Sequence, residues 1–194
     1  MDYTQLKSEV IDWSHRTDID SKMDLFTELA ESVINKDLRT IEMEKRTFIT
    51  VDDAFVDLPD DYIELRALEL ELTGRRAVLK FFTPQQLDII TSNGSGNPYG
   101  YTIQGNQIEI RPAADSSAPI SGEITYIAEV PTLVTNADNI ILDKYPLIYL
   151  SAMMIQVYLY TQDAEELSKW TESYNSQIKM ANKSAGRYVL PQVQ

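Results

Sequence analysis

The sequence contains no cysteine and only one histidine among its 194 residues. Without cysteine the chain can form no disulfide and can offer no thiolate as a nucleophile or metal ligand. A zinc site built on cysteine and histidine is excluded by count. A histidine-based catalytic triad could use only His15, which lies beside Arg16 at the end of an expected helix and which we interpret as a solvated surface residue.

Basic residues are also scarce, with 17 Lys and Arg against 30 Asp and Glu and a net charge of −13. A chain of this charge repels the phosphates of nucleic acids, so specific DNA binding through a basic face is disfavoured. The hydrophobic content of 43% and charged content of 24% are those of a globular chain. We therefore expect a folded, acidic protein with enough length for one large domain or two small ones.

Long apolar runs are missing as well. The most apolar segment, residues 147–160, is interrupted by Ser151 and Gln156. It is shorter than the roughly 18 to 20 residues that a membrane-spanning helix needs, so we interpret it as a buried core helix. The N-terminus lacks a basic region followed by an apolar run, so no secretory signal is expected.

Two local patterns suggest a chemical role but do not match the motifs that the role requires. The segment from Asp18 has a faint calcium-loop spacing, but its sixth position is Met23 and its twelfth is Leu29, where glycine and glutamate are needed. Residues 94–100 (GSGNPYG) do not match a phosphate-binding glycine motif and precede an expected strand. The expectation is therefore no catalytic residue, no cofactor and no metal. A carboxylate-pair glycan hydrolase stays open as an alternative, because thirty acids supply many pairs.

The stretch LPDDYIELRAL, residues 58–68, raises the question of its two adjacent carboxylates. Asp60 and Asp61 follow Pro59 and precede a run of apolar and helix-favouring residues. Carboxylates accept hydrogen bonds from the free N–H groups of a helix start and suit its positive end. We therefore expect either of them to cap a helix that begins near Tyr62, and both to favour its positive end.

Apolar spacing predicts two helices at each end of the chain and strands between them. The expected helices cover residues 3–16, 21–41, 145–160 and about 163–186, with Ser21 and Asp24 as a capping box and Thr161 or Asp163 as a later cap. The expected strands are 47–51, 77–82, 101–103, 107–110 and 123–127, with a short helix capped by Thr83 and a tight hairpin at 104–106. This order predicts an α+β fold, a four-helix bundle of two N-terminal and two C-terminal helices with an inserted antiparallel β-rich region. The expected divisions are 1–45, 46–142, 143–186 and an extended tail, 187–194.

An ordered set of short motifs carries a resemblance over about residues 20 to 185. They are Leu58-Pro59-Asp60-Asp61-Tyr62, Thr83-Pro84 with Leu87, Pro98 through Tyr101 to Pro112, Tyr126 to Leu133, Tyr145-Pro146 with Tyr149, and Trp170. In this order and spacing the chain resembles the head–tail adaptor proteins of tailed phages, also called connector or head-completion proteins. Each motif is weak alone, and the ordered set is the signal.

The resemblance implies a structural virion protein and no enzyme. It implies a homo-oligomeric ring, typically of twelve copies, beneath the portal protein and joined to tail nozzle or tail tube proteins. Genomic DNA would pass through the lumen without specific binding, and no membrane is involved. The protein would lie at the head–tail junction of the virion, after assembly in the host cytoplasm. A small protein-binding module remains a further alternative.

Two sets of contact residues follow from the same resemblance. The C-terminal segment of the chain, residues 187–194, would bind the portal through Arg187, Tyr188, Val189, Leu190 and Pro191. Loops of the β-rich region would contact tail proteins through Asn93, Asn97, Tyr99 and Asp115.

Overall fold

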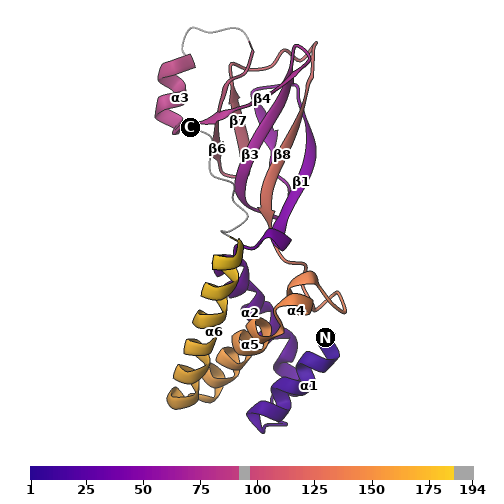
Figure 1. Cartoon of the computed structure of the whole chain (residues 1–194), viewed down its shortest axis with the longest axis vertical. Helices are drawn as coiled ribbons and strands as arrows, with labels where there is room; N and C mark the ends of the chain where they lie inside the picture. Colours follow the sequence, from indigo (N-terminus) through magenta and orange to yellow (C-terminus); the bar gives the residue numbers. More distant parts are fainter. Residues whose placement is uncertain (92–96, 186–194) are drawn as a thin grey trace. The chain divides into compact units, whose positions relative to one another are not determined.

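The computed structural model describes residues 1–91 and 97–185 of the chain (Figure 1). Contacts divide the chain into two compact units. The helical unit consists of Met1–Met43 together with the chain from Glu129 onward, and the β unit is Glu44–Ala128. Each unit has its own buried core and is described by itself.

The helical unit is built around α5, the most apolar of its helices. Its α-helices are α1 (Tyr3–Ser14), α2 (Met23–Asp37), α4 (Ile140–Lys144), α5 (Pro146–Thr161) and α6 (Ala164–Ala185), with 3₁₀ turns η1 (Asp20–Lys22) and η2 (Ile41–Met43). Helix α5 contacts α1, α2, α4 and α6. Because neighbours surround it, α5 buries residues around most of its circumference, as a central helix must.

Helix α2 buries a stripe at helical spacing that includes Phe26, Ala30 and Ile34. Leu29 lies off this stripe and is 44% exposed. The predicted capping box is wrong, because the turn η1 leads directly into α2 and no side chain caps the helix. The side chain of Asp24 instead accepts a hydrogen bond from the Tyr3 hydroxyl at 2.8 Å.

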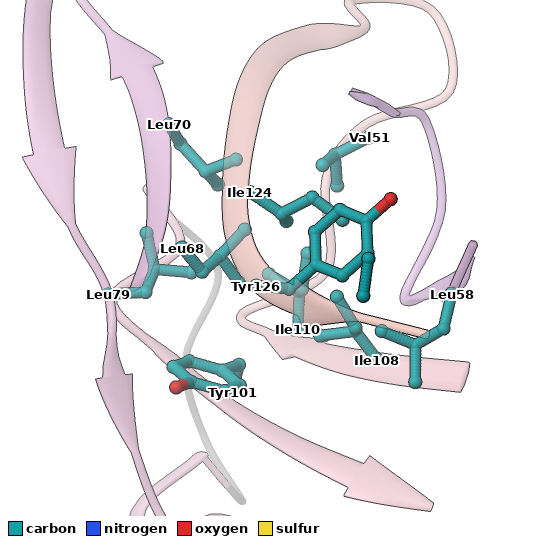
Figure 2. Close-up of a cluster of buried hydrophobic side chains, with 11 residues drawn as sticks. Val51, Leu58, Leu68, Leu70, Leu79, Tyr101, Ile108, Ile110, Ile124 and Tyr126 are labelled. Atoms are coloured by element: carbon teal, nitrogen blue, oxygen red, sulfur yellow. The ribbon is translucent and has the colours of Figure 1, made fainter. Parts of the chain in front are cut away.

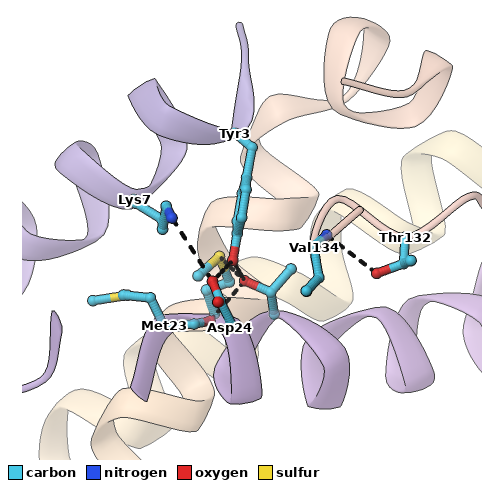
Figure 3. A network of polar contacts seen from close by, with 8 residues as sticks. Tyr3, Lys7, Met23, Asp24, Thr132 and Val134 are labelled. Carbon is cyan, nitrogen blue, oxygen red and sulfur yellow. Dashed lines mark hydrogen bonds and ion pairs between the residues drawn. The ribbon is translucent and has the colours of Figure 1, made fainter. Parts of the chain in front are cut away.

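The Tyr3 hydroxyl joins α1 to α2 in a small polar network (Figure 3). It lies 2.8 Å from an Asp24 oxygen and 2.9 Å from the Thr27 hydroxyl. Thr27 in turn donates to the Met23 carbonyl at 2.8 Å. Lys7 forms an ion pair with Asp24 at 3.7 Å. Burial and the nearby Asp24 carboxylate raise the pKa of Tyr3, so the hydroxyl keeps its proton and its donor role.

The β unit consists of two four-stranded sheets. The first sheet has the order β1-β8-β3-β4, from β1 (Glu44–Val51), β8 (Ile120–Ala128), β3 (Tyr62–Leu72) and β4 (Arg75–Val78). The second sheet has the order β2-β7-β6-β5, from β2 (Phe55–Asp57), β7 (Gln107–Arg111), β6 (Gly100–Gln104) and β5 (Lys80–Phe81). Helix α3 (Pro84–Thr91) lies between β5 and β6 in the sequence, and these two strands are paired in parallel. All other pairs are antiparallel.

The core of the β unit combines the inner faces of both sheets (Figure 2). Leu68 and Ile124 come from the first sheet, and Ile108 and Ile110 come from the second. Leu58, just before the turn that precedes β3, is also buried in this cluster. Because side chains alternate along a strand, the intervening residues of each strand face outward.

The predicted four-helix bundle is wrong. The described part of the chain contains six α-helices, five of them in the helical unit. The spacing analysis missed α4, a helix of five residues that ends just before Pro146. It also missed that the insert is two sheets with one parallel pair, because sheet partners are not encoded in local spacing.

Two local predictions inside the β unit are also wrong. The helix expected after Asp60 and Asp61 is the strand β3. The single strand expected over 77–82 is two strands, β4 and β5, which belong to different sheets. Leu79 lies between them and is buried, which brings the chain across from one sheet to the other.

Several local signals are confirmed. The Thr83 hydroxyl accepts a hydrogen bond from Gln86 N, and the Gln86 side chain accepts one from Thr83 N. These two reciprocal bonds cap the N-terminus of α3. Asp163 accepts from Glu166 N at 3.2 Å and so caps α6. The hairpin turn lies at 105–106, with Gly105 at φ 62°.

Candidate interaction surfaces

Asp61 fastens the turn before β3 to the rest of the first sheet. One of its oxygens accepts from the Tyr126 hydroxyl at 2.8 Å, and the other accepts from Lys45 Nζ at 2.5 Å. Burial by itself raises the pKa of Asp61, but the bonds from Lys45 and Tyr126 outweigh it and hold the pKa below its ordinary value. Asp60 is exposed. The two carboxylates therefore have different roles, and the bound one is structural.

The described residues of the predicted tail-contact loops lie near one end of the β6–β7 hairpin. Tyr99 N donates to the Arg111 carbonyl at 3.1 Å, so the residues just before β6 lie beside the end of β7. The Tyr99 side chain is 42% exposed, and Asn97 is exposed as well. Asp115 follows shortly after β7 in a turn in which it accepts from Ser117 N and Oγ, and these bonds hold its pKa below the ordinary value. The chain thus enters β6 and leaves β7 at the same end of the hairpin, away from the 105–106 turn, and Asp115 follows Arg111 by four residues.

The remaining predicted contact residues cannot be placed. Asn93 and the residues from Arg187 to Pro191 lie outside the described residues.

The outer face of the first sheet carries exposed apolar side chains that were not predicted from the sequence. Phe48 on β1 is 79% exposed and Val78 on β4 is 66% exposed. The sequence pattern predicts a strand over 47–51 but does not single out Phe48 as an exposed residue. A usable signal was its alternation with Ile49 and Val51, because a strand that buries Val51 turns Phe48 outward.

Between these two edges lies a cluster of ion pairs around Glu123 on β8. Its carboxylate contacts Arg46 Nε at 2.9 Å and Arg76 Nη1 at 3.1 Å, and its side chain is only 10% exposed. Arg76 also lies 3.6 Å from Glu69. A small hollow beside the cluster is lined by Phe48, Leu70 and Gly122 together with the charged side chains of Glu69, Arg76 and Glu123. Charges paired in this way fix the outer surface of the sheet and its side-chain positions.

Two aromatic pairs in the helical unit each include one exposed ring. Trp13 and Trp170 meet edge to face with ring centroids 5.5 Å apart, and Phe26 and Tyr160 lie 5.7 Å apart. Trp13 is 53% exposed and Tyr160 is 55% exposed. Exposed tryptophan and tyrosine are typical of the energetic centres of protein interfaces.

One buried acid needs to be considered against the hydrolase alternative. Glu31 on α2 is 5% exposed, and burial raises its pKa despite hydrogen bonds from Thr132, Leu133 N and Tyr149. Asn139 completes the network by donating to the Tyr149 hydroxyl at 2.7 Å. These partners occupy the carboxylate and tie the segment after Glu129 to α2 and α5. Glu31 is therefore a packing residue, and glycoside hydrolysis needs two acids that face each other across a cleft.

The remaining features considered are the single histidine, clusters of metal ligands and membrane-spanning helices. His15 is exposed at the C-cap of α1 with φ 52°. Within residues 1–91 and 97–185 no group of three or more potential metal ligands comes together. No helix in these same ranges is both long and apolar enough to cross a membrane.

Exposed aromatic side chains beside paired charges are typical of surfaces that contact other proteins. The sequence profile of one family, the SU10 adaptor proteins, matches residues 1–193. The chain belongs to this family, which is a family of phage head–tail adaptors. The predicted family is thereby confirmed, and the protein is a virion component of the head–tail junction. A comparison with curated proteins gives no match.

Proposed function

We propose that this protein forms a ring of twelve copies beneath the portal and joins the portal to tail nozzle or tail tube proteins. The observation that carries the proposal is the family match over residues 1–193, which includes both units. A closed ring uses one kind of contact between successive copies, so a single chain can build it. Copies would assemble onto the portal in the host cytoplasm.

We propose further that genomic DNA passes through the ring without binding it. The net charge of −13 supports this role, because a channel wall of the same sign as the phosphates offers no counterions to displace. A strongly charged chain also stays soluble before assembly.

In this proposal the two predicted contact regions bind different partners. The tail residues Arg187, Tyr188, Val189, Leu190 and Pro191 bind the portal. The loops with Asn93, Asn97, Tyr99 and Asp115 contact tail proteins. Support for the second assignment comes from the exposure of Asn97, Tyr99 and Asp115, and from the bond that places Tyr99 beside Arg111, four residues before Asp115.

Native mass spectrometry of the chain, alone and mixed with the portal protein of the same phage, tests the proposal. We expect a monomer alone and a full ring on the portal. A chain truncated after Gly186 is expected to lose loading onto the portal. A Tyr99→Ala, Asp115→Ala double variant is the matched control, because it is expected to load normally and to fail only in capturing tail proteins. A full-length chain that ignores the portal would refute the adaptor ring.

A further inference from the structure

The first sheet ends in two open edges. Its outer strands are β1 and β4, and in the described part of the chain neither pairs with a strand on its outer side. Strand β1 has eight residues and β4 has four, whereas the edge strands of the second sheet, β2 and β5, have three and two. An open edge presents unpaired N–H and C=O groups that favour the addition of another strand.

The two edges run in opposite directions. Strand β1 is antiparallel to β8, β8 is antiparallel to β3, and β3 is antiparallel to β4. Strand β4 is therefore antiparallel to β1. When copies follow one another around a ring in the same orientation, β4 of one copy can lie against β1 of the next with antiparallel sense, which needs no inversion of either copy.

The exposed apolar side chains fit this arrangement. Phe48 and Val78 both face outward, since their strand partners on the same face are Glu123 and Glu69. If Phe48 lies opposite Val78 across the new pair, then Ile49 lies opposite Ala77 on the inner face. Each edge then covers an apolar side chain that the isolated chain leaves exposed.

Charges near the ends of the two strands are complementary in the same register. Arg75 begins β4 and is exposed, and Val51 at the end of β1 would lie opposite it. Asp52 and Asp53 follow Val51 and are exposed, so the arginine approaches two carboxylates. At the other end of β1 the charged residues Glu44, Lys45 and Arg46 discourage pairing with unrelated strands.

We propose that β4 of one copy extends the first sheet at β1 of the next copy, so that the sheets join around the ring. This inference rests on the proposed ring and names its contact. A pair of strands limited by the four residues of β4 is far smaller than the roughly 800 Å² per partner of a stable interface. The contact therefore does not hold copies together in solution, and it forms when the portal gathers them.

Cysteine cross-linking tests the contact without background, because the natural chain has no cysteine. A Phe48→Cys, Val78→Cys double variant is mixed with the portal protein and oxidised, since facing residues of paired strands lie close enough for a disulfide. We expect a ladder of covalent oligomers up to the full ring, and no ladder from either single variant or from the double variant without portal. A Phe55→Cys, Phe81→Cys variant, on the edges of the second sheet, is the matched control and is expected to give no ladder.

Charge reversal gives an independent readout. Arg75→Glu is expected to lower the fraction of portal that carries a full ring, and adding Asp52→Arg in the same chain is expected to restore it. Native mass spectrometry separates the two proposals. A full ring of the Phe48→Cys, Val78→Cys variant that yields no ladder would overturn the joined sheets and leave the ring intact. Absence of any ring from the natural chain would overturn both.

Discussion

Asp61 connects elements that are distant in sequence, through Lys45 on β1 and Tyr126 on β8. Its neighbour Asp60 has the same chemistry and is exposed. A carboxylate thus stabilises the fold when a cation and a hydroxyl lie within hydrogen-bond distance of it. Asp61 has both partners, and this difference separates its structural role from that of Asp60.

Replacing Asp61 by Asn is expected to lower the free energy of unfolding by about 1 kcal/mol at neutral pH, because the partner of Lys45 loses its charge. The folded-state pKa of Asp61 lies below the ordinary 3.8, so its contribution is present above that pH and is lost as the pH falls through the folded value. Urea unfolding at pH 7 and pH 3 measures both effects. Asp60→Asn is the control and is expected to change little, and equal losses in the two variants would contradict the assignment.

Glu31 carries the opposite pH dependence. Its folded-state pKa is raised above the ordinary 4.5, so between these values the folded state binds more protons than the unfolded state. The natural chain is therefore expected to lose stability relative to Glu31→Gln as the pH rises from about 4.5 through the raised value. Unfolding of both chains across this range checks the prediction, with Glu172→Gln, an exposed position on α6, as the control. A difference between the chains that does not vary with pH would count against it.

At the scale of the elements, β8 is the strand on which the first sheet depends, because it pairs with both β1 and β3. Gly122 lies at the centre of this contact, opposite Ile49 on one side and Leu70 on the other. A Cβ at this position would lie 2.5 Å from the Leu70 side chain and 3.0 Å from the Glu69 carbonyl oxygen. The position needs glycine for space and not for its backbone angles.

Gly122→Ala is accordingly expected to lower the free energy of unfolding by about 1 to 3 kcal/mol, since the backbone of β3 cannot move away without loss of pairing. Chemical unfolding followed by tyrosine fluorescence measures the change. Ser121→Ala, on the same strand with its side chain exposed, is expected to stay within about 0.5 kcal/mol of the natural chain. A Gly122→Ala chain as stable as this control would show that the sheet tolerates the added methyl group.

At the scale of the whole molecule, the β unit is one continuous segment whose two ends lie side by side. Glu44, its first residue, pairs with Ile127, one residue before its last. Its core of both sheets lies within the segment. The chain can therefore leave the helical unit and return to it at neighbouring points, as expected for an inserted domain.

Residues 44–128 expressed alone are thus expected to fold cooperatively, with dispersed amide resonances in an NMR spectrum. A chain in which this segment is replaced by a short Gly-Ser linker is expected to keep its helical circular dichroism, because Met43 and Glu129 need only a short connection. Loss of cooperative unfolding in the isolated segment would mean that its core depends on the remainder of the chain.

Much of the local structure could be predicted from the sequence because its causes are local. The caps at Thr83 and Asp163, the turn at 105–106 and the start of α5 at Pro146 depend on residues within four positions of one another. The family could also be predicted, since ordered motifs survive as a linear pattern. Among the predicted contact residues, Asn97, Tyr99 and Asp115 are exposed, while their function stays a prediction.

The remainder was decided by tertiary structure. The sequence of β3 is rich in Leu, Glu, Arg and Ala, which favour a helix, yet Leu68, Leu70 and Leu72 also alternate with acids, and pairing with β8 and β4 selects the strand. Exposure of Phe48 and Trp13, the separation of β4 from β5, and the bond between Lys45 and Asp61 all depend on partners far away in sequence. The sequence by itself determined the caps at Thr83 and Asp163, the turn at 105–106 and the family to which the chain belongs. The tertiary structure decided which strands pair and which side chains remain on the surface, because those outcomes are set by contacts that no local pattern records.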